Sequence, residues 1–127
     1  MTEIDPRVLE FAHQIFDLAR AGDAEQIGTL VDAGVPVDLA DARGNTILML
    51  AAYAGQTAVV SALITRGADV NRLNLRGQSP VAGAIFKGED EIVRLLVAAG
   101  ADLDLGTPSA RETARMFERM DLLEPNG

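Results

Sequence analysis

Residues 41–55 read DARGNTILMLAAYAG, and the frame of this stretch recurs along the chain at a fixed interval. Gly22, Gly55 and Gly88 are spaced 33 residues apart. A period of this length is typical of a repeat protein, in which each unit covers the apolar face of its neighbour. Other positions keep the same register: Gly34, Gly67 and Gly100; Gly44 and Gly77; Ile27, Val60 and Val93; Leu30, Leu63 and Leu96; Val37, Val70 and Leu103.

Within one unit the residue types predict two short helices. Gly44 lies in the turn before the first helix, where a left-handed backbone is inexpensive for glycine. Thr46 supplies a hydroxyl that can cap this helix, as Ser79 does in the next unit. Gly55 ends the first helix, and an apolar stripe that includes Val59, Val60 and Leu63 predicts a second helix that ends at Gly67.

The opening D-x-x-G-x-T of residues 41–46, the Leu-Ala-Ala of 50–52 and the closing Gly-Ala-Asp-Val-Asn of 67–71 strongly resemble the ankyrin-repeat family. The resemblance implies an all-α solenoid of stacked helix-turn-helix units with short β-turn or hairpin connections. We expect one domain over 1–127, with a capping repeat (1–40), two repeats (41–73 and 74–106) and a C-terminal cap (107–127). Met1 and the polar caps favour a small stand-alone protein.

Local signals place the ends of the stack and two weak points. Asp5-Pro6 predicts the start of a helix, and Ser109 with Glu112 fits a capping box. Gly83 and Gly28 fall inside predicted helices, where glycine costs roughly 1 kcal/mol relative to alanine. Repacking by a compensating volume swap is the favoured interpretation of Gly83, with a yielding inner helix as the alternative. Gly28 has no evident compensation.

Composition limits the classes of function. The chain has 127 residues, 48% hydrophobic and 24% charged, as expected for a folded soluble domain. It has no cysteine, its N-terminus has neither a basic region nor an apolar stretch, and no apolar run approaches membrane-spanning length. We therefore expect a cytoplasmic protein without disulfides or a membrane anchor. A net charge of −8 disfavours nucleic acid and anionic lipid as partners.

The resemblance also implies where a partner binds, namely on the concave side formed by turn tips and first helices. Eight of the eleven Lys and Arg residues, Arg115 among them, map on or near this side, which predicts a basic groove with Tyr53 and Phe86 at its centre. Such a groove fits acidic and apolar groups of another protein. Alternatively, these arginines pair with nearby aspartates and only solvate the surface. The predicted partner-binding residues are Arg20, Arg43, Asn45, Tyr53, Arg72, Leu73, Leu75, Arg76, Gln78, Phe86, Lys87, Arg111 and Arg119.

Motifs for catalysis, cofactors and metals are missing from the sequence. His13 and Asp17 could form a dyad on one helix face, but no nucleophile motif accompanies them, and a surface or capping histidine is the better interpretation. The recurrent aspartates follow the repeat and lack a calcium-loop pattern, so turn capping explains them. No Gly-rich phosphate loop or G-x-S-x-G is present. We predict no enzyme activity, no cofactor and no metal site.

The predicted function is a protein-protein interaction module, an adaptor or regulator that holds one partner in its concave groove. An inhibitor that masks a basic or catalytic site would suit the acidic body but not the basic groove. Self-association through an exposed end of the stack is an alternative, although we expect a monomer. Nucleic-acid binding, with Tyr53 and Phe86 as stacking groups, is a weaker alternative because of the net charge.

Overall fold

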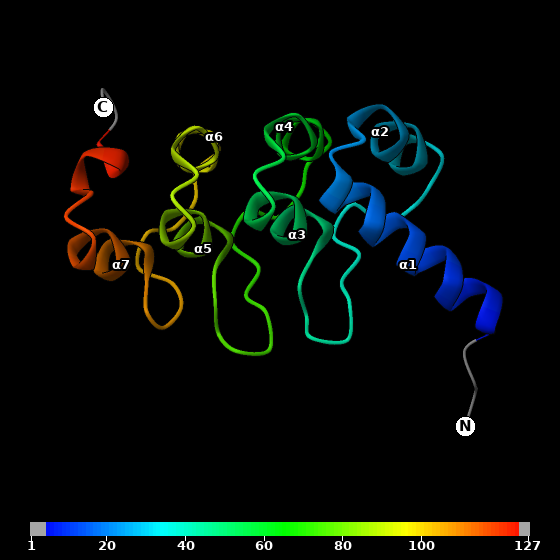
Figure 1. Ribbon diagram of the computed structural model, residues 1–127, viewed down its shortest axis with the longest axis horizontal. Coiled ribbons are helices and arrows are strands. Elements are labelled where there is room, and N and C mark those ends of the chain that lie inside the picture. The colour runs from blue at the N-terminus through cyan, green and yellow to red at the C-terminus, as the bar shows by residue number, and fades with distance from the viewer. Residues whose placement is uncertain (1–4, 125–127) are drawn as a thin grey trace.

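The computed structural model describes residues 5–124 and consists of helices stacked in two rows, with loops that project to one side (Figure 1). The first row holds α1 (Pro6–Ala21), α3 (Ile47–Tyr53), α5 (Pro80–Phe86) and α7 (Ala110–Met116). The second row holds α2 (Ala24–Asp32), α4 (Thr57–Thr65), α6 (Asp90–Ala98) and the 3₁₀ helix η1 (Met120–Leu123). Between residues 5 and 124 there is no strand, only one antiparallel bridge between Ala40 and Thr46. The predicted all-α solenoid is confirmed.

Residues 1–4, which belong to the N-terminal stretch without a basic region or an apolar run, lie outside the described residues, as do residues 125–127. The repeat boundaries at 40/41, 73/74 and 106/107 remain a prediction. Each predicted unit contains one pair of helices from the two rows, with η1 as the second member in the C-terminal cap.

Side-chain caps fix where the first-row helices begin. The carboxylate of Asp5 accepts a hydrogen bond from the backbone N–H of Arg7 at the start of α1. The hydroxyls of Thr46 and Ser79 accept from backbone N–H groups three residues later, both at 3.2 Å. Ser109 and Glu112 form both bonds of a capping box, at 3.0 and 3.1 Å. These caps satisfy N–H groups that the first helical turn leaves unpaired.

The repeat period determines how neighbouring units contact each other. Ile27, Val60 and Val93, which share one register, are all fully buried in a single core. Hydrogen bonds recur between units as well: the N–H of Asp69 donates to Asp38, and the N–H of Asp102 donates to Asn71. Successive loops are joined by the N–H of Leu75, which donates to the carbonyl of Arg43 at 3.0 Å. Each unit therefore depends on its neighbour for burial and for backbone hydrogen bonds.

The space beside each helix glycine, Gly28 and Gly83, is occupied by a side chain from the adjacent unit. A β-carbon on Gly83 would overlap the ring of Tyr53, so the glycine in α5 makes room for the aromatic ring at the end of α3. A β-carbon on Gly28 would lie 2.7 Å from the guanidinium of Arg66, which pairs with Asp32 at 2.9 Å. The expectation that Gly28 lacks compensation is therefore wrong, because it accommodates an ion pair between α4 and α2. At Gly83, repacking by a neighbouring ring accounts for the glycine.

Candidate functional site

A hollow of about 570 Å³ lies across α3, α5 and α7 and the tips of the two loops that precede α3 and α5. We call it the basic groove. It brings together six of the thirteen predicted residues, from two successive units, with further lining residues from the C-terminal cap. Its lining consists of Arg43, Tyr53, Arg76, Gln78, Ala82, Gly83, Phe86, Lys87, Pro108, Thr113 and Met116.

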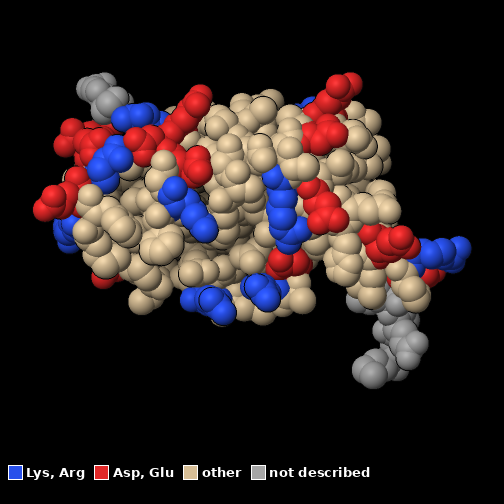
Figure 2. All heavy atoms as spheres, viewed as in Figure 1, with Lys and Arg blue, Asp and Glu red and all other residues tan. Residues whose placement is uncertain are grey.

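Three cations of the basic groove are free of intramolecular partners. Within residues 5–124, the side chains of Arg43, Arg76 and Lys87 make no hydrogen bond and no ion pair shorter than 4.0 Å. No acidic residue lines the groove. In the space-filling view, cationic groups appear over the lower centre of this face, while acidic groups gather over the end that carries α6 and η1 (Figure 2). The groove therefore presents uncompensated positive charge on a chain with a net charge of −8.

Other predicted cations are committed to contacts inside the protein. Arg20 pairs with Asp17 at 3.2 Å, and Arg111 pairs with Asp104 at 2.9 Å. Arg119 joins η1 to α6 because its guanidinium binds Asp121 at 3.1 Å and Asp90 at 2.8 Å. Hydrogen bonds from Arg119 lower the pKa of Asp121. Arg72 also donates a hydrogen bond to a loop carbonyl, that of Asp38, at 3.3 Å. For these four arginines, the alternative prediction, in which the side chains pair within the protein, describes the contacts better than a role in binding a partner.

The remaining predicted residues lie at the loop tips. Asn45 and Gln78 both accept hydrogen bonds from the side-chain amide of Asn74, at 2.9 and 2.8 Å, which ties successive tips together. Leu73 and Leu75 are exposed, Leu75 to 79%, and neither lines the groove. They are available on the surface but are not gathered with the cations.

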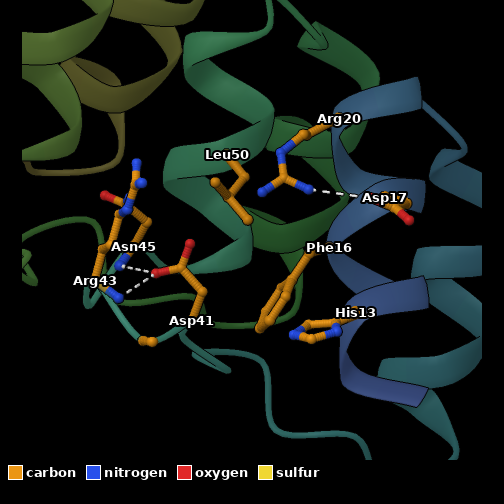
Figure 3. Close-up of a pocket in the computed structure, with 9 residues that line it drawn as sticks. His13, Phe16, Asp17, Arg20, Asp41, Arg43, Asn45 and Leu50 are labelled. Carbon is orange, nitrogen blue, oxygen red and sulfur yellow. Dashed lines mark hydrogen bonds and ion pairs between the residues drawn. The ribbon is translucent and has the colours of Figure 1, made fainter. Parts of the chain in front are cut away.

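A second hollow, of about 530 Å³, lies between α1 and the first loop and has mixed charge (Figure 3). His13, Phe16, Asp17 and Arg20 face it from α1, across from the loop residues Asp41, Ala42, Arg43 and Asn45, with Leu50 from α3. Asp41 accepts the backbone N–H groups of Arg43 and Asn45 at 2.9 and 3.0 Å. Arg43 lines both hollows, so they adjoin along the same face.

The histidine in this second hollow is not arranged as a catalytic base. Asp17 accepts from Arg20, and His13 makes no hydrogen bond within residues 5–124. Its ring lies against Phe16, with centroids 6.3 Å apart. A general base in a dyad needs a hydrogen-bonded group that orients it, and Asp17 is engaged elsewhere.

Tyr53 forms part of the floor of the basic groove and has an unusual polar atom. Its hydroxyl is buried and has no hydrogen-bond partner among the described residues. Burial raises the pKa of this phenol to about 12, because the surroundings disfavour the charged form. At the floor of the groove, the side chain of Tyr53 therefore occupies the space that a β-carbon at Gly83 would fill, and its buried hydroxyl has no partner among the described residues.

Sequence reasoning missed the apolar end of the groove. Met116 is 63% exposed and Phe117 is 47% exposed, and both belong to the C-terminal cap. The ring of Phe117 meets the ring of Phe86 edge to face, with centroids 5.8 Å apart. The register could have shown this, since Met116 and Phe117 lie at the end of α7 as Phe86 and Lys87 lie at the end of α5, about one repeat earlier.

No helix within residues 5–124 combines the length and apolar character that crossing a bilayer requires. The same residues contain no group of three or more His, Cys, Asp or Glu side chains placed to hold a metal ion.

Comparison with known proteins identifies the family. A family model described as ankyrin repeats (3 copies) matches residues 15–107. A Pseudomonas aeruginosa protein named as an ankyrin repeat protein is 43% identical over 51 residues, which are 40% of this chain and 30% of that protein. The matched segment thus covers less than a third of that relative. With the family model covering most of its length, this chain belongs to the ankyrin-repeat family.

Proposed function

We propose that this protein acts by binding another protein in the basic groove, without catalysis, and that the bound surface of the partner is acidic and apolar. Ankyrin repeats are generally protein-protein interaction modules, which gives the class of function. The observation that carries the finer proposal is the groove lining, where Arg43, Arg76 and Lys87 lack partners among the described residues and no acid is present. The cytoplasmic location expected from the sequence is part of the same proposal.

The physical chemistry of the lining supports this choice of partner. A guanidinium recognises a carboxylate through two parallel hydrogen bonds, which an ammonium group cannot form. Tyr53 and Phe86 are of the residue types enriched at interface hot spots, and here they line the same groove as the cations. A partner that offers carboxylates beside apolar groups would complement both kinds of lining at once.

The proposal is tested by capture from a lysate of the source organism, with bound proteins identified by mass spectrometry. The wild type is compared with Arg43→Glu/Arg76→Glu, which reverses two groove charges. The matched control is Arg7→Glu/Arg94→Glu, which makes the same change in net charge at two exposed arginines outside the groove. Circular dichroism first establishes that all three proteins fold.

The expected result is a protein retained by the wild type and by the control but lost from the groove variant. Retention should weaken as salt is raised, because ion pairs at an exposed surface are screened. Equal capture by all three proteins would contradict the groove assignment. Capture lost from both variants would assign binding to the overall charge of the protein.

A further inference from the structure

The exposed large apolar residues of the described chain fall into three places. Val8, Leu9 and Phe11 lie on the N-terminal half of α1, and Leu73 and Leu75 lie on a loop. Phe86, Met116 and Phe117 form the third group, at the end of the basic groove formed by α5 and α7. Exposed apolar patches that adjoin polar groups often mark interaction sites.

This third group, which we call the apolar shelf, has a defined structure. The shelf is held in place by the edge-to-face contact of Phe86 with Phe117 and by α5–α7 packing, in which Ala84 and Ala114 are fully buried. Phe86 is 66% exposed and Met116 is 63% exposed, so each keeps most of its side chain uncovered. Both line the same hollow as the free cations.

We propose that the apolar shelf is an anchor site for one large apolar side chain of the partner, and that carboxylates next to this side chain bind Lys87, Arg76 and Arg43. This inference rests on the proposed function and adds a position and an order along the groove. Lys87 directly follows Phe86 at the end of α5, so a carboxylate beside the anchor meets a cation at once. Arg76 and Arg43 lie on successive loop tips, which a backbone hydrogen bond joins side by side.

Charge along the face gives the order. Around the shelf and the central cations the lining has no acid, whereas the hollow at α1 contains Asp17 and Asp41, and its Arg20 is already paired with Asp17. Additional carboxylates would meet like charges there. The acidic part of the partner therefore extends from the shelf to Arg43 and ends before α1.

A second copy of this chain is the competing occupant, through the exposed Val8, Leu9 and Phe11 of α1. Two observations disfavour it. This helix half carries Arg7 as well as Glu10, so it offers little net acidity to the groove. Two copies also repel each other because each has a net charge of −8.

The inference is tested by selecting displayed random 12-residue peptides on the wild type and measuring the affinity of a selected peptide by fluorescence polarisation. The shelf variant is Met116→Ala/Phe117→Ala, and the charge variant is Arg43→Glu/Arg76→Glu. Val8→Ala/Phe11→Ala is the matched control, since it removes similar exposed apolar area on α1. Circular dichroism checks the fold of each variant, and Phe86→Ala, at the most exposed shelf residue, serves as a second shelf variant.

We expect enriched peptides that combine one Phe, Leu, Ile or Met with neighbouring Asp or Glu. The shelf and charge variants should each weaken the peptide by at least about tenfold, as truncation of an interface anchor does, while the control stays within about twofold. Replacing the apolar residue of the peptide by alanine should remove the difference between the wild type and the shelf variant but leave the effect of the charge variant.

Three other results would each overturn the inference. If the charge variant weakens binding and the shelf variants do not, the groove function stands and the anchor site is wrong. If none of the variants changes affinity, or no peptide is enriched, both the anchor site and the proposed binding function of the groove are wrong. If the wild type forms dimers or chains in sedimentation velocity, and both the shelf variant and Val8→Ala/Phe11→Ala abolish them, a second copy is the occupant.

Discussion

Replacing Gly83 with alanine adds one methyl group where the ring of Tyr53 already lies. In an ordinary helix this change is favourable by about 1 kcal/mol, because alanine loses less backbone freedom than glycine. Here the new β-carbon would lie 2.7 Å from Cζ and 2.8 Å from the hydroxyl oxygen of Tyr53. These distances are well inside van der Waals contact, so the ring has to move.

The size of the effect follows from two opposing contributions. Forcing an extra methyl into packed surroundings costs about 1–3 kcal/mol, against a helix gain of about 1 kcal/mol. We therefore expect Gly83→Ala to lower the free energy of unfolding by up to about 2 kcal/mol in the wild type. In a Tyr53→Ala background the ring is absent, and the same change should raise it by about 1 kcal/mol.

The assay is a double-mutant cycle measured by urea unfolding and followed by circular dichroism at the helix band. The effect of Gly83→Ala on the free energy of unfolding should differ by about 2 kcal/mol between the two backgrounds, well above the difference of about 0.3–0.5 kcal/mol expected of independent sites. Tyr53→Phe is the control, because phenylalanine keeps the ring and should keep the coupling. If Gly83→Ala stabilised both backgrounds equally, the reasoning that Gly83 exists to receive Tyr53 would be refuted.

Further outcomes follow from the contacts of Tyr53, Arg119 and Gly28. Tyr53→Phe should raise the free energy of unfolding by about 1 kcal/mol, because the change removes a buried hydroxyl without a partner; unchanged or lower stability in urea would contradict this. The one tyrosine of the chain should titrate by ultraviolet absorbance near pH 12 when folded and near pH 10 in urea. Since its folded pKa is the higher one, the unfolded chain ionises first as the pH rises, so wild type should lose further stability relative to Tyr53→Phe between about pH 10 and pH 12. Arg119→Ala should lower the melting temperature at neutral pH by detaching η1 from α6. The gap from wild type should narrow in acid, because Asp121 has a lowered folded pKa and its contribution disappears as the pH falls through that value; a gap that does not narrow as the pH falls below the usual aspartate range would show that the pairing is not the cause. Gly28→Ala should be milder than Gly83→Ala in urea unfolding, because the atoms in its way belong to the flexible end of Arg66; an equal or larger loss would contradict this.

Local sequence signals were sufficient for the helices and their order. The hydroxyls of Thr46 and Ser79 cap the helices at the expected positions, and the fully buried Ile27, Val60 and Val93 occupy one register. These features depend on residues close in sequence or on the repeat period, both of which can be read directly from the chain.

Contacts between units were harder to predict than the units themselves. The sequence shows that Gly28 and Gly83 are poor helix residues but does not show which side chain fills each space. The answer comes from the following unit for Gly28, which receives Arg66, and from the preceding unit for Gly83, which receives Tyr53. Since each partner lies about one repeat away, an aligned comparison of neighbouring units is the signal that could have identified both.

Some residues of the candidate groove could be predicted from the sequence, because their position in the repeat alone determines which way the side chain faces. Arg43 and Arg76 occupy the same position in successive units, and both line the groove. Arg111 and Arg119 also have suitable positions, but each has a carboxylate within reach, whereas Arg43 and Arg76 pair with none of the described residues. Which cation stays free is thus set by the surrounding acids, and a count of arginines along one face overstates the charge available for binding.

The contrast between groove and body has a consequence for how an acidic partner would be recognised. At a distance the partner meets a protein with a net charge of −8 and is repelled. Attraction begins only within about 8 Å of the free cations, the distance over which physiological salt screens charge. Fast electrostatic steering is therefore not available, and affinity has to come from contacts made in the groove. Carboxylates alone would gain little binding free energy in the groove, because they lose hydration when they bind. Binding of this kind therefore also requires an apolar anchor beside the cations.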